Sequence, residues 1–388
     1  MRQQFVIAMA VLVTTALVGG VAGVAAGTQP AIEQPTTTDA LSDAADGPTG
    51  HQYDDAETCE FPVELTDATG TTVTLEERPE RITTTNPSAA QTLWELGAQD
   101  RVVGVTQFAL YLDGADEKTG VSAEGLGVSI ERVVDTDPDL VLAPNASADQ
   151  VEDLREQGLT VYHFPEATDI DDIADKTETI GQLVGECEAA ADTNDEMYDA
   201  VADVEERTAD FDRPAALYPL GDGFVAAGNT FIDAIMTIGG TDNVAAAEHE
   251  GYPQLSDEVI LEADPELIIV TDEEAAILDE EPYASTTAGI DRNYVVIPVH
   301  YLNQPAPRSV IESTDTLATA VEELQTTEEA ADEADDADDA ATTDDADEAD
   351  DADDAATADD DTGAEVPGFG VVAAVIAMLA AGLLARRE

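Results

Sequence analysis

Two glutamates, Glu131 and Glu258, occupy the same position in a stretch that the chain contains twice, as Ile130–Pro144 and again as Asp257–Thr271. In each copy the glutamate falls in the expected first turn of a short helix. A carboxylate there complements the helix dipole by roughly 0.3–1 kcal/mol, and it is also preorganised for a bidentate contact with an arginine of another protein. One glutamate alone would favour the first role. The duplication favours the second, a docking contact.

Residues that catalyse reactions or hold metals show no recognisable spacing in this chain. Its four histidines stand far apart, at positions 51, 163, 249 and 300. The sequence contains no Gly-x-Ser-x-Gly nucleophile motif, no phosphate-binding loop and no Cys-x-x-Cys pair. We therefore expect a binding protein that is not an enzyme and that has no metal site or resident cofactor.

The duplicated stretch also predicts the local fold around each glutamate. A short amphipathic helix stops at Asp137-Pro138 in the first copy and at Asp264-Pro265 in the second, because proline disfavours helical backbone at the residue before it. An apolar run of strand length follows, which is typical of a strand covered on both faces of a parallel sheet. Because strands and helices also alternate elsewhere, the chain predicts an α/β fold with two similar lobes.

Composition divides the chain into seven segments. The first has the charged start, apolar middle and small-residue end of a secretory signal peptide. The sixth is so rich in like charge that it has nothing to bury and should stay extended. In chain order we expect a signal peptide, a flexible linker, a first lobe, a linking helix, a second lobe, an acidic disordered stalk and a membrane-anchor segment, at residues 1–27, 28–58, 59–185, 186–211, 212–326, 327–365 and 366–388.

The charge balance limits the partners and the environment of the protein. The chain carries 86 acidic and 14 basic residues, a formal net charge of −72. The acidic residues are spread through the expected lobes as well as the tail. We interpret the protein as halophilic, because at molar salt the Debye length is only about 3 Å and the repulsion is screened. Nucleic acid is excluded as a partner, because no basic patch can meet its phosphates.

The two cysteines, Cys59 and Cys187, lie far apart in the sequence. An exported protein with an even number of cysteines can form one disulfide, which here would tie the segment before the first strand to the long linking helix. The alternative is two unrelated buried thiols.

A series of short motifs in a specific order resembles the substrate-binding proteins of ABC importers for cobalamin and ferric siderophores. Besides the duplicated stretch, the motifs are Thr66-Asp-Ala-Thr-Gly70, Arg78-Pro-Glu-Arg-Ile82, Pro87-Ser88, Leu96-Gly97, Val102-Val-Gly-Val105 and Pro307-Arg308. The resemblance covers residues 61–325 and implies two Rossmann-like lobes with central parallel sheets, joined by one long rigid helix around a ligand cleft. It also implies that Glu131 and Glu258 pair with arginines of the importer's permease, which works with an ATPase subunit.

The C-terminus resembles a haloarchaeal sorting signal. Pro367-Gly-Phe369 precedes an apolar run and then Arg386-Arg387. By this resemblance an archaeosortase would cut near the motif and attach a lipid anchor. We therefore expect a secreted protein that is anchored to the outer face of the cell membrane and is monomeric.

The resemblance and the positions of loops after strands nominate ligand-binding residues, most of them aromatic. Aromatic side chains suit a corrin or a metal chelate, which presents a broad apolar face with polar edges. An equally plain role for any of them is packing under its own loop, and Arg308 could equally hold the last helix. The nominated residues are Asn86, Pro87, Phe108, Tyr111, Tyr218, Phe224, Tyr252, His300, Tyr301 and Arg308.

Two departures from the family pattern bear on the ligand. The loop Ser122–Gly127 lacks the tryptophan of relatives that bind cobalamin, and His300 stands where they carry an acidic residue. We expect cobalamin or a related corrinoid, with a ferric siderophore or haem as the alternative. A hydrolase on the same framework lacks its motifs here, and a tethered surface adhesin would need neither the matched glutamates nor the linking helix.

Overall fold

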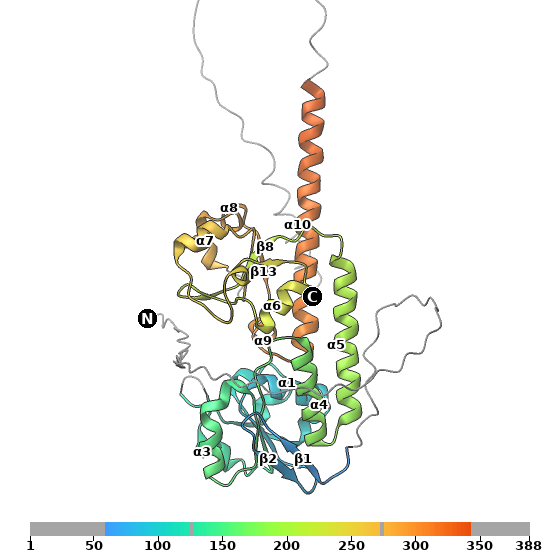
Figure 1. Ribbon diagram of the computed structural model, residues 1–388, viewed down its shortest axis with the longest axis vertical. Helices are drawn as coiled ribbons and strands as arrows, with labels where there is room; N and C mark the ends of the chain where they lie inside the picture. Colours follow the sequence, from blue (N-terminus) through green and yellow to red (C-terminus); the bar gives the residue numbers. More distant parts are fainter. Residues whose placement is uncertain (1–58, 125–126, 272–274, 343–388) are drawn as a thin grey trace, which may run out of the picture. The chain divides into compact units, whose positions relative to one another are not determined.

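The computed structural model describes residues 59–124, 127–271 and 275–342 (Figure 1). The predicted signal peptide, the linker up to residue 58, the stalk from residue 343 and the anchor segment lie outside these residues. In the described part of the chain, no helix has the length and apolar character needed to cross a membrane.

The first lobe is built on a five-stranded parallel sheet with the strand order β5-β4-β3-β6-β7. All four residues of its strand β6 are buried, which explains why that segment is continuously apolar and does not alternate. The strands are β3 (Ile82–Thr84), β4 (Val102–Val105), β5 (Thr119–Gly120), β6 (Leu140–Ala143) and β7 (Val161–His163). The helices of this lobe are α1 (Pro87–Glu95), α2 (Ile130–Asp135), α3 (Val151–Glu156) and α4 (Ile170–Val184).

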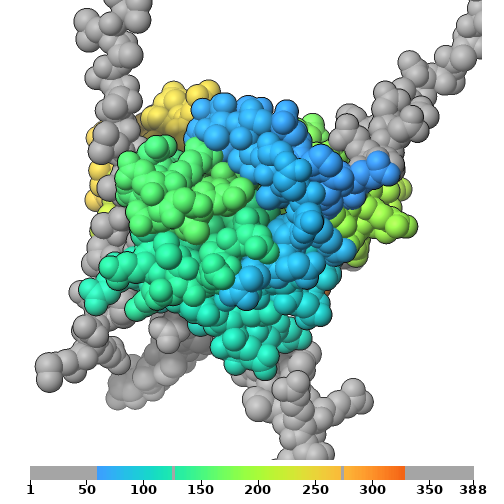
Figure 2. Space-filling model, turned by 90° about the horizontal axis from the view of Figure 1, so that it is seen from below, coloured from blue at the N-terminus to red at the C-terminus, as the bar shows by residue number. Residues whose placement is uncertain are grey.

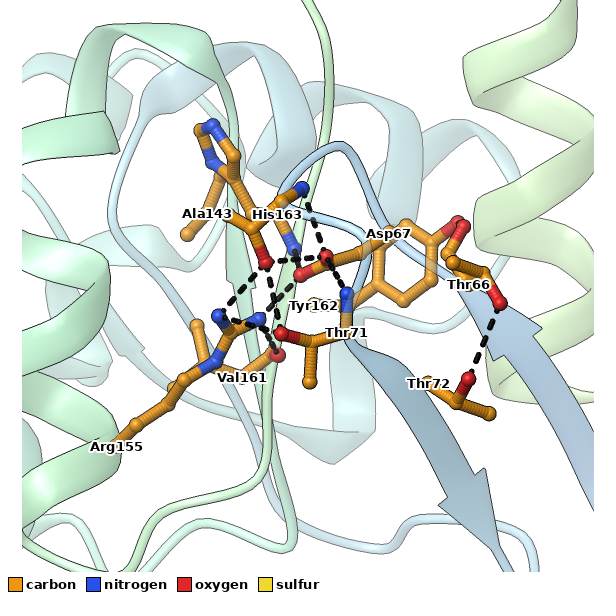
Figure 3. Close-up of polar contacts among 10 residues, drawn as sticks. Thr66, Asp67, Thr71, Thr72, Ala143, Arg155, Val161, Tyr162 and His163 are labelled. Carbon is orange, nitrogen blue, oxygen red and sulfur yellow. Dashed lines mark hydrogen bonds and ion pairs between the residues drawn. The ribbon is translucent and has the colours of Figure 1, made fainter.

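An antiparallel hairpin, β1 (Val63–Thr66) and β2 (Thr72–Leu75), packs on the first lobe through the buried side chains of Val73 and Leu75 and through one buried carboxylate. Figure 3 shows Asp67, at the hairpin turn, paired with Arg155 of α3 and accepting hydrogen bonds from the backbone N–H groups of Thr71 and His163. Burial alone would raise the pKa of Asp67, but these hydrogen bonds and those from Thr69 outweigh it and hold the pKa below its usual value. In Figure 2 the start of this lobe, in blue, lies beside green segments from later in the chain.

The second lobe repeats the plan with a four-stranded parallel sheet in the order β11-β8-β12-β13. A short antiparallel ribbon, β9 and β10, extends from it. The strands are β8 (Ala215–Leu217), β9 (Pro219–Gly221), β10 (Phe224–Val225), β11 (Asp242–Asn243), β12 (Leu267–Val270) and β13 (Tyr294–Val296). The helices are α6 (Phe231–Ile238), α7 (Asp257–Ala263), α8 (Thr287–Asp291) and α9 (Val299–Leu302).

Short 3-10 helices fill the connections in both lobes. They are η1 (Gln99–Arg101), η2 (Gln107–Ala109), η3 (Ala115–Glu117), η4 (Asn145–Gln150), η5 (Val244–Ala247), η6 (Ala276–Asp279) and η7 (Tyr283–Ser285).

The duplicated stretch forms the same helix-turn-strand unit in both lobes, as α2 with β6 and as α7 with β12. Each helix begins with a serine cap: the side chains of Ser129 and Ser256 accept hydrogen bonds from backbone N–H groups at 3.4 Å. Asp137 and Asp264, which precede the prolines, adopt φ angles of 46° and 39°. Aspartate tolerates the left-handed region better than most residues, so the chain turns sharply from helix to strand.

The lobes are joined by one long helix, as the sequence suggested, and a second long helix packs beside it. Helix α5 (Cys187–Thr208) spans 22 residues, or about 33 Å, and falls within the predicted range 186–211. Helix α10 (Pro307–Thr342) runs beside it (Figure 1), and Arg207 of α5 donates hydrogen bonds to Asp315 and Thr319 of α10. This pairing makes the connection between the lobes stiffer than one helix alone.

Helix α10 continues through residues 327–342, which we expected to be the start of a disordered stalk. That part of the prediction is wrong. The segment is rich in alanine, the best helix former, which offsets the lower helix propensity of its aspartates, and it extends a helix already nucleated by packing on the second lobe. Like-charge repulsion, which the prediction emphasised, is a weaker effect per residue than helix propagation once it is screened by salt.

Cys59 and Cys187 form a disulfide with a Cα–Cα distance of 5.8 Å. It ties the start of the first lobe to the first residue of α5. The bond closes a long segment, because its two cysteines are 128 positions apart.

Candidate ligand-binding site

Three of the nominated residues meet where the two lobes face each other. Tyr111 follows β4 in the first lobe, whereas His300 and Tyr301 lie on α9 in the second. The Tyr111 ring stacks on His300 with 4.5 Å between ring centroids, and it meets Tyr301 edge-on at 6.4 Å. The segments that carry them follow the carboxyl ends of parallel strands, which is where ligands bind in α/β proteins. The structure therefore places an aromatic cluster across the lobe junction.

The aromatic cluster is held by hydrogen bonds that also cross between the lobes. The Tyr111 hydroxyl donates to Oε1 of Gln91 on α1 at 2.5 Å, and the Gln91 side-chain N–H donates to the Ser309 hydroxyl of α10 at 3.1 Å. Burial, reinforced by the negative charge of Glu95, raises the pKa of Tyr111, so its hydroxyl stays protonated. A protonated Tyr111 keeps both its hydrogen bond and its ring in place.

Beside this cluster lies a cavity of about 540 Å³, bounded by α1, α5, the start of α10 and the loop at Tyr111. Trp94, Tyr111 and Tyr301 contribute aromatic surface to it. Its volume is within the range of roughly 300–1,000 Å³ that is typical of small-molecule pockets. Below, we refer to it as the junction cavity.

Burial shifts the pKa of two charged side chains, that of Glu95, which lines the junction cavity, and that of Lys176, whose charge acts on Glu95. Burial raises the pKa of Glu95 to about 7, although Gln91, Arg308 and Lys176 all lower it. Lys176 of α4 is fully buried, which lowers its pKa. It donates hydrogen bonds to the Pro305 carbonyl and, at 3.4 Å, to the Ser88 hydroxyl. Lys176 therefore links α1 of the first lobe to the segment that leads into α10.

Three nominated residues of the second lobe lie away from the junction cavity. Tyr218 is only 3% exposed, and its hydroxyl donates to Asn303 at 3.1 Å; burial raises the pKa of Tyr218 to about 12. Tyr252 is half-buried, and burial together with the charge of Glu166 raises its pKa to about 12. Phe224 is half-buried on β10. Tyr218 thus packs in the core of the second lobe, and its contact with a ligand stays a prediction.

Four further nominated residues lie at the start of α1, after β4 and at the start of α10, and most of them are also away from the junction cavity. Asn86 caps α1, because its side-chain oxygen accepts a hydrogen bond from the Ser88 N–H at 2.8 Å. Pro87 is buried in the first helical turn, so it has no free surface to offer a ligand. Phe108 is 45% exposed and Arg308 is exposed, and of these four only Arg308 lines the junction cavity.

Sequence reasoning missed Gln91 and Glu95, which line the junction cavity from α1. A signal was present, because two polar residues four positions apart interrupt a helix whose other residues up to Leu93 are almost all buried and small or apolar. Lys176 was missed as well. A lysine on the buried face of α4 is itself unusual, since charged side chains are rarely buried without a role.

Glu131 and Glu258 are both exposed, each in the first turn of its helix. Neither side chain has a hydrogen-bond or ion-pair partner among the residues that the structure describes. Val134 and Leu261, one turn further along, are 38% and 43% exposed and are equivalent in the repeat. Each lobe therefore presents the same pair, a free carboxylate and an exposed apolar side chain.

Comparison with known proteins identifies the framework. The family model described as periplasmic binding protein matches residues 82–299. The chain belongs to the periplasmic binding protein family. The resemblance inferred from its motifs is therefore confirmed, and the two-lobed α/β architecture is the one expected for this family. Members of the family are the binding proteins of ABC importers.

A second model, the PGF-CTERM motif, matches residues 366–388. This periplasmic binding protein is therefore anchored at the cell surface through its C-terminus, as the sorting signal predicted.

Named relatives cover most of the chain. A cobalamin-binding protein of Halobacterium salinarum is 45% identical over 352 residues, which is 87% of this chain and 92% of the relative. An ABC transporter substrate-binding lipoprotein of Bacillus subtilis is 30% identical over 224 residues, 55% of this chain and 70% of the relative.

Solved structures show the same fold at lower identity. The vitamin B12 binding protein of Vibrio cholerae superposes with a TM-score of 0.55 at 23% identity, covering 64% of this chain and 98% of that one. A periplasmic heme-binding protein of Roseiflexus gives 0.56 at 22% identity, covering 62% and 99%.

Proposed function

We propose that this periplasmic binding protein captures cobalamin or a related corrinoid outside the cell and delivers it to an ABC importer. The observation that carries the proposal is the 45% identity to a haloarchaeal cobalamin-binding protein, which extends over 87% of this chain. A match over this share of the chain spans both lobes, so a shared ligand class is the simplest explanation.

The arrangement of the lobe junction supports a ligand of this kind. Tyr111, His300 and Tyr301 pack on one another between the lobes. Aromatic side chains of this kind also pack well against a flat macrocycle. The absence of a cluster of three or more metal-ligating side chains in the described residues suits a ligand whose metal is already held by its own macrocycle. In this proposal the corrinoid is the transported ligand and not part of a catalytic centre.

Docking is the second part of the proposal. Glu131 and Glu258, one per lobe, pair with arginines of the permease, and Val134 and Leu261 add apolar contact beside them. A free carboxylate on a rigid, capped helix loses little conformational entropy on forming such a pair. The chain then acts as a monomer that spans the permease with both lobes and presents its ligand to the ATPase-driven importer.

The proposal is tested with Trp94, the single tryptophan of the chain, which lines the junction cavity. Its fluorescence is followed in molar salt during titration with cyanocobalamin, with a ferric hydroxamate and with haemin. The proposal is supported if cyanocobalamin saturates the quenching at a lower concentration than the ferric hydroxamate and haemin do. Saturation by the ferric chelate or haemin alone overturns the assignment of the ligand.

A further inference from the structure

The junction cavity has a distinctive distribution of charge. Asp113, Glu196 and Glu312 stand around it as exposed carboxylates, and Arg308 is the cation that lines it. None of the three carboxylate groups has a hydrogen-bond or ion-pair partner within the described ranges. Glu95 adds a fourth carboxyl group, whose oxygens are buried and make no well-aligned hydrogen bond.

Arg308 differs from every other basic residue that the structure describes. Each of the other lysines and arginines donates at least one hydrogen bond, to a carboxylate, a hydroxyl or a carbonyl. The Arg308 guanidinium donates none within the described residues and forms no ion pair there, even though Glu312 lies one helical turn away. In a chain with 86 acidic and 14 basic residues, a guanidinium left unpaired beside a cavity is an available hydrogen-bond donor.

The charged side chains around the cavity favour some functional groups of a ligand over others. A carboxylate would pair with Arg308 but would face several carboxylates of the same charge. An ammonium group would pair with the carboxylates but would face the guanidinium. A primary amide satisfies both, because its carbonyl accepts from the guanidinium while its N–H groups donate to carboxylate oxygens.

We propose that the junction cavity is a subsite for a neutral primary-amide arm of the ligand, recognised by Arg308 and by the carboxylates of Glu196 and Glu312. This inference rests on the proposed function, because the periphery of a corrinoid carries primary amides, whereas haem carries two carboxylates. A volume of about 540 Å³ accommodates an arm and an edge of such a macrocycle rather than the whole ligand. The macrocycle itself then packs against the neighbouring cluster of Tyr111, His300 and Tyr301. The subsite makes the protein selective for amide-bearing macrocycles over acidic ones.

The test compares cyanocobalamin with its purified monocarboxylic acids, in each of which one peripheral amide has been hydrolysed. Binding is measured by equilibrium dialysis in molar salt. For the wild-type protein, at least one of the acids should bind about tenfold more weakly than cyanocobalamin, since hydrogen bonds to charged groups are worth roughly 1.5–3 kcal/mol. In the double variant Glu196→Gln, Glu312→Gln, the affinities for cyanocobalamin and for that acid should differ by only about twofold. Arg308→Gln should weaken cyanocobalamin about tenfold. The matched control is Arg292→Gln, an exposed arginine on the second lobe that pairs with Asp279, and it should bind like wild type.

The possible outcomes distinguish failure of the amide subsite from failure of the proposed function. If cyanocobalamin binds, but all of its acids bind equally well and Arg308→Gln has no effect, the amide subsite is wrong and the proposed function stands. The subsite is also wrong if the double glutamine variant leaves the ratio of the affinities for cyanocobalamin and for its acids unchanged. If the wild-type protein binds no corrinoid, the proposed function fails and the inference fails with it.

Discussion

Tyr111 and His300 stack across the lobe junction at 4.5 Å, although 189 positions separate them in the chain (300 − 111). The contact does not stand alone. Gln91 bonds to Ser309 and Lys176 bonds to the Pro305 carbonyl, so the start of α10 is attached to two helices of the first lobe. Because α5 and α10 are also paired, we expect the relative motion of the lobes to be small.

The stack provides a first prediction. Tyr111→Ala removes both the ring that packs on His300 and surface of the junction cavity, so affinity for the corrinoid should fall about tenfold. Tyr111→Phe keeps the ring and should stay within about threefold of wild type. Calorimetric titration measures both. Tyr294→Ala, at an exposed tyrosine on β13, is the control, and an equal loss in that variant would mean that the effect is not local.

Substitution of the two docking glutamates should impair uptake without weakening ligand binding. The double variant Glu131→Gln, Glu258→Gln removes both charges that the permease would meet, so importer-dependent uptake should fall at least about tenfold while corrinoid affinity changes by less than about twofold. Uptake of labelled corrinoid in cells measures the first quantity. Glu152→Gln with Glu188→Gln changes first-turn glutamates of α3 and α5 instead, and it should leave uptake normal. Normal uptake in the first variant would refute the docking role.

The disulfide should contribute substantially to stability. Cys59→Ser with Cys187→Ser opens a cross-link between positions 128 apart, and the expected loss in the free energy of unfolding is about 2–5 kcal/mol. Guanidinium unfolding in molar salt measures it. Reductant should destabilise the wild-type protein by a similar amount and have no effect on the variant; a wild-type protein indifferent to reductant, after complete reduction is verified, would contradict the prediction.

Glu95 gives stability a defined dependence on pH. Burial raises its pKa from 4.5 to about 7, so across this window the folded protein holds a proton that the unfolded chain has released. The contribution of Glu95 to the free energy of unfolding therefore falls as pH rises from about 4.5 to about 7, by about 3 kcal/mol at most. Lys176, whose pKa burial lowers, acts above this window and with the opposite sign.

Glu95→Gln tests this dependence. It should resemble wild type at about pH 5 and be more stable than wild type at about pH 7, as measured by denaturant unfolding at both values. Glu205→Gln, at an exposed position on α5, should show no such pH-dependent difference. A Glu95→Gln difference that is the same at both pH values would show that the carboxyl group does not titrate differently in the folded state.

Local patterns explain why much of the fold could be read from the sequence. The Asp137-Pro138 and Asp264-Pro265 stops and the continuous apolar runs after them depend on neighbouring residues, so they predict the paired units α2-β6 and α7-β12 correctly. The left-handed conformation of both aspartates is a detail that the pattern does not specify.

The site was less accessible to the same reasoning, because it depends on residues that only the fold brings together. Gln91, Glu95 and Arg308 come from helices at opposite ends of the folded region, and nothing in their spacing relates them. Tyr218 was nominated for its position after a strand, but burial against the second-lobe core decides its role. The continuation of α10 into residues 327–342 was also missed, because it depends on a packed first half that sequence patterns do not reveal.

The most direct measurement is a competition titration by calorimetry on the protein in molar potassium chloride, with cyanocobalamin and haemin as the two ligands. Our account predicts saturable binding of cyanocobalamin with one site per chain, retained in the presence of haemin. Saturable binding of haemin that cyanocobalamin cannot displace, together with no heat from cyanocobalamin alone, would contradict it.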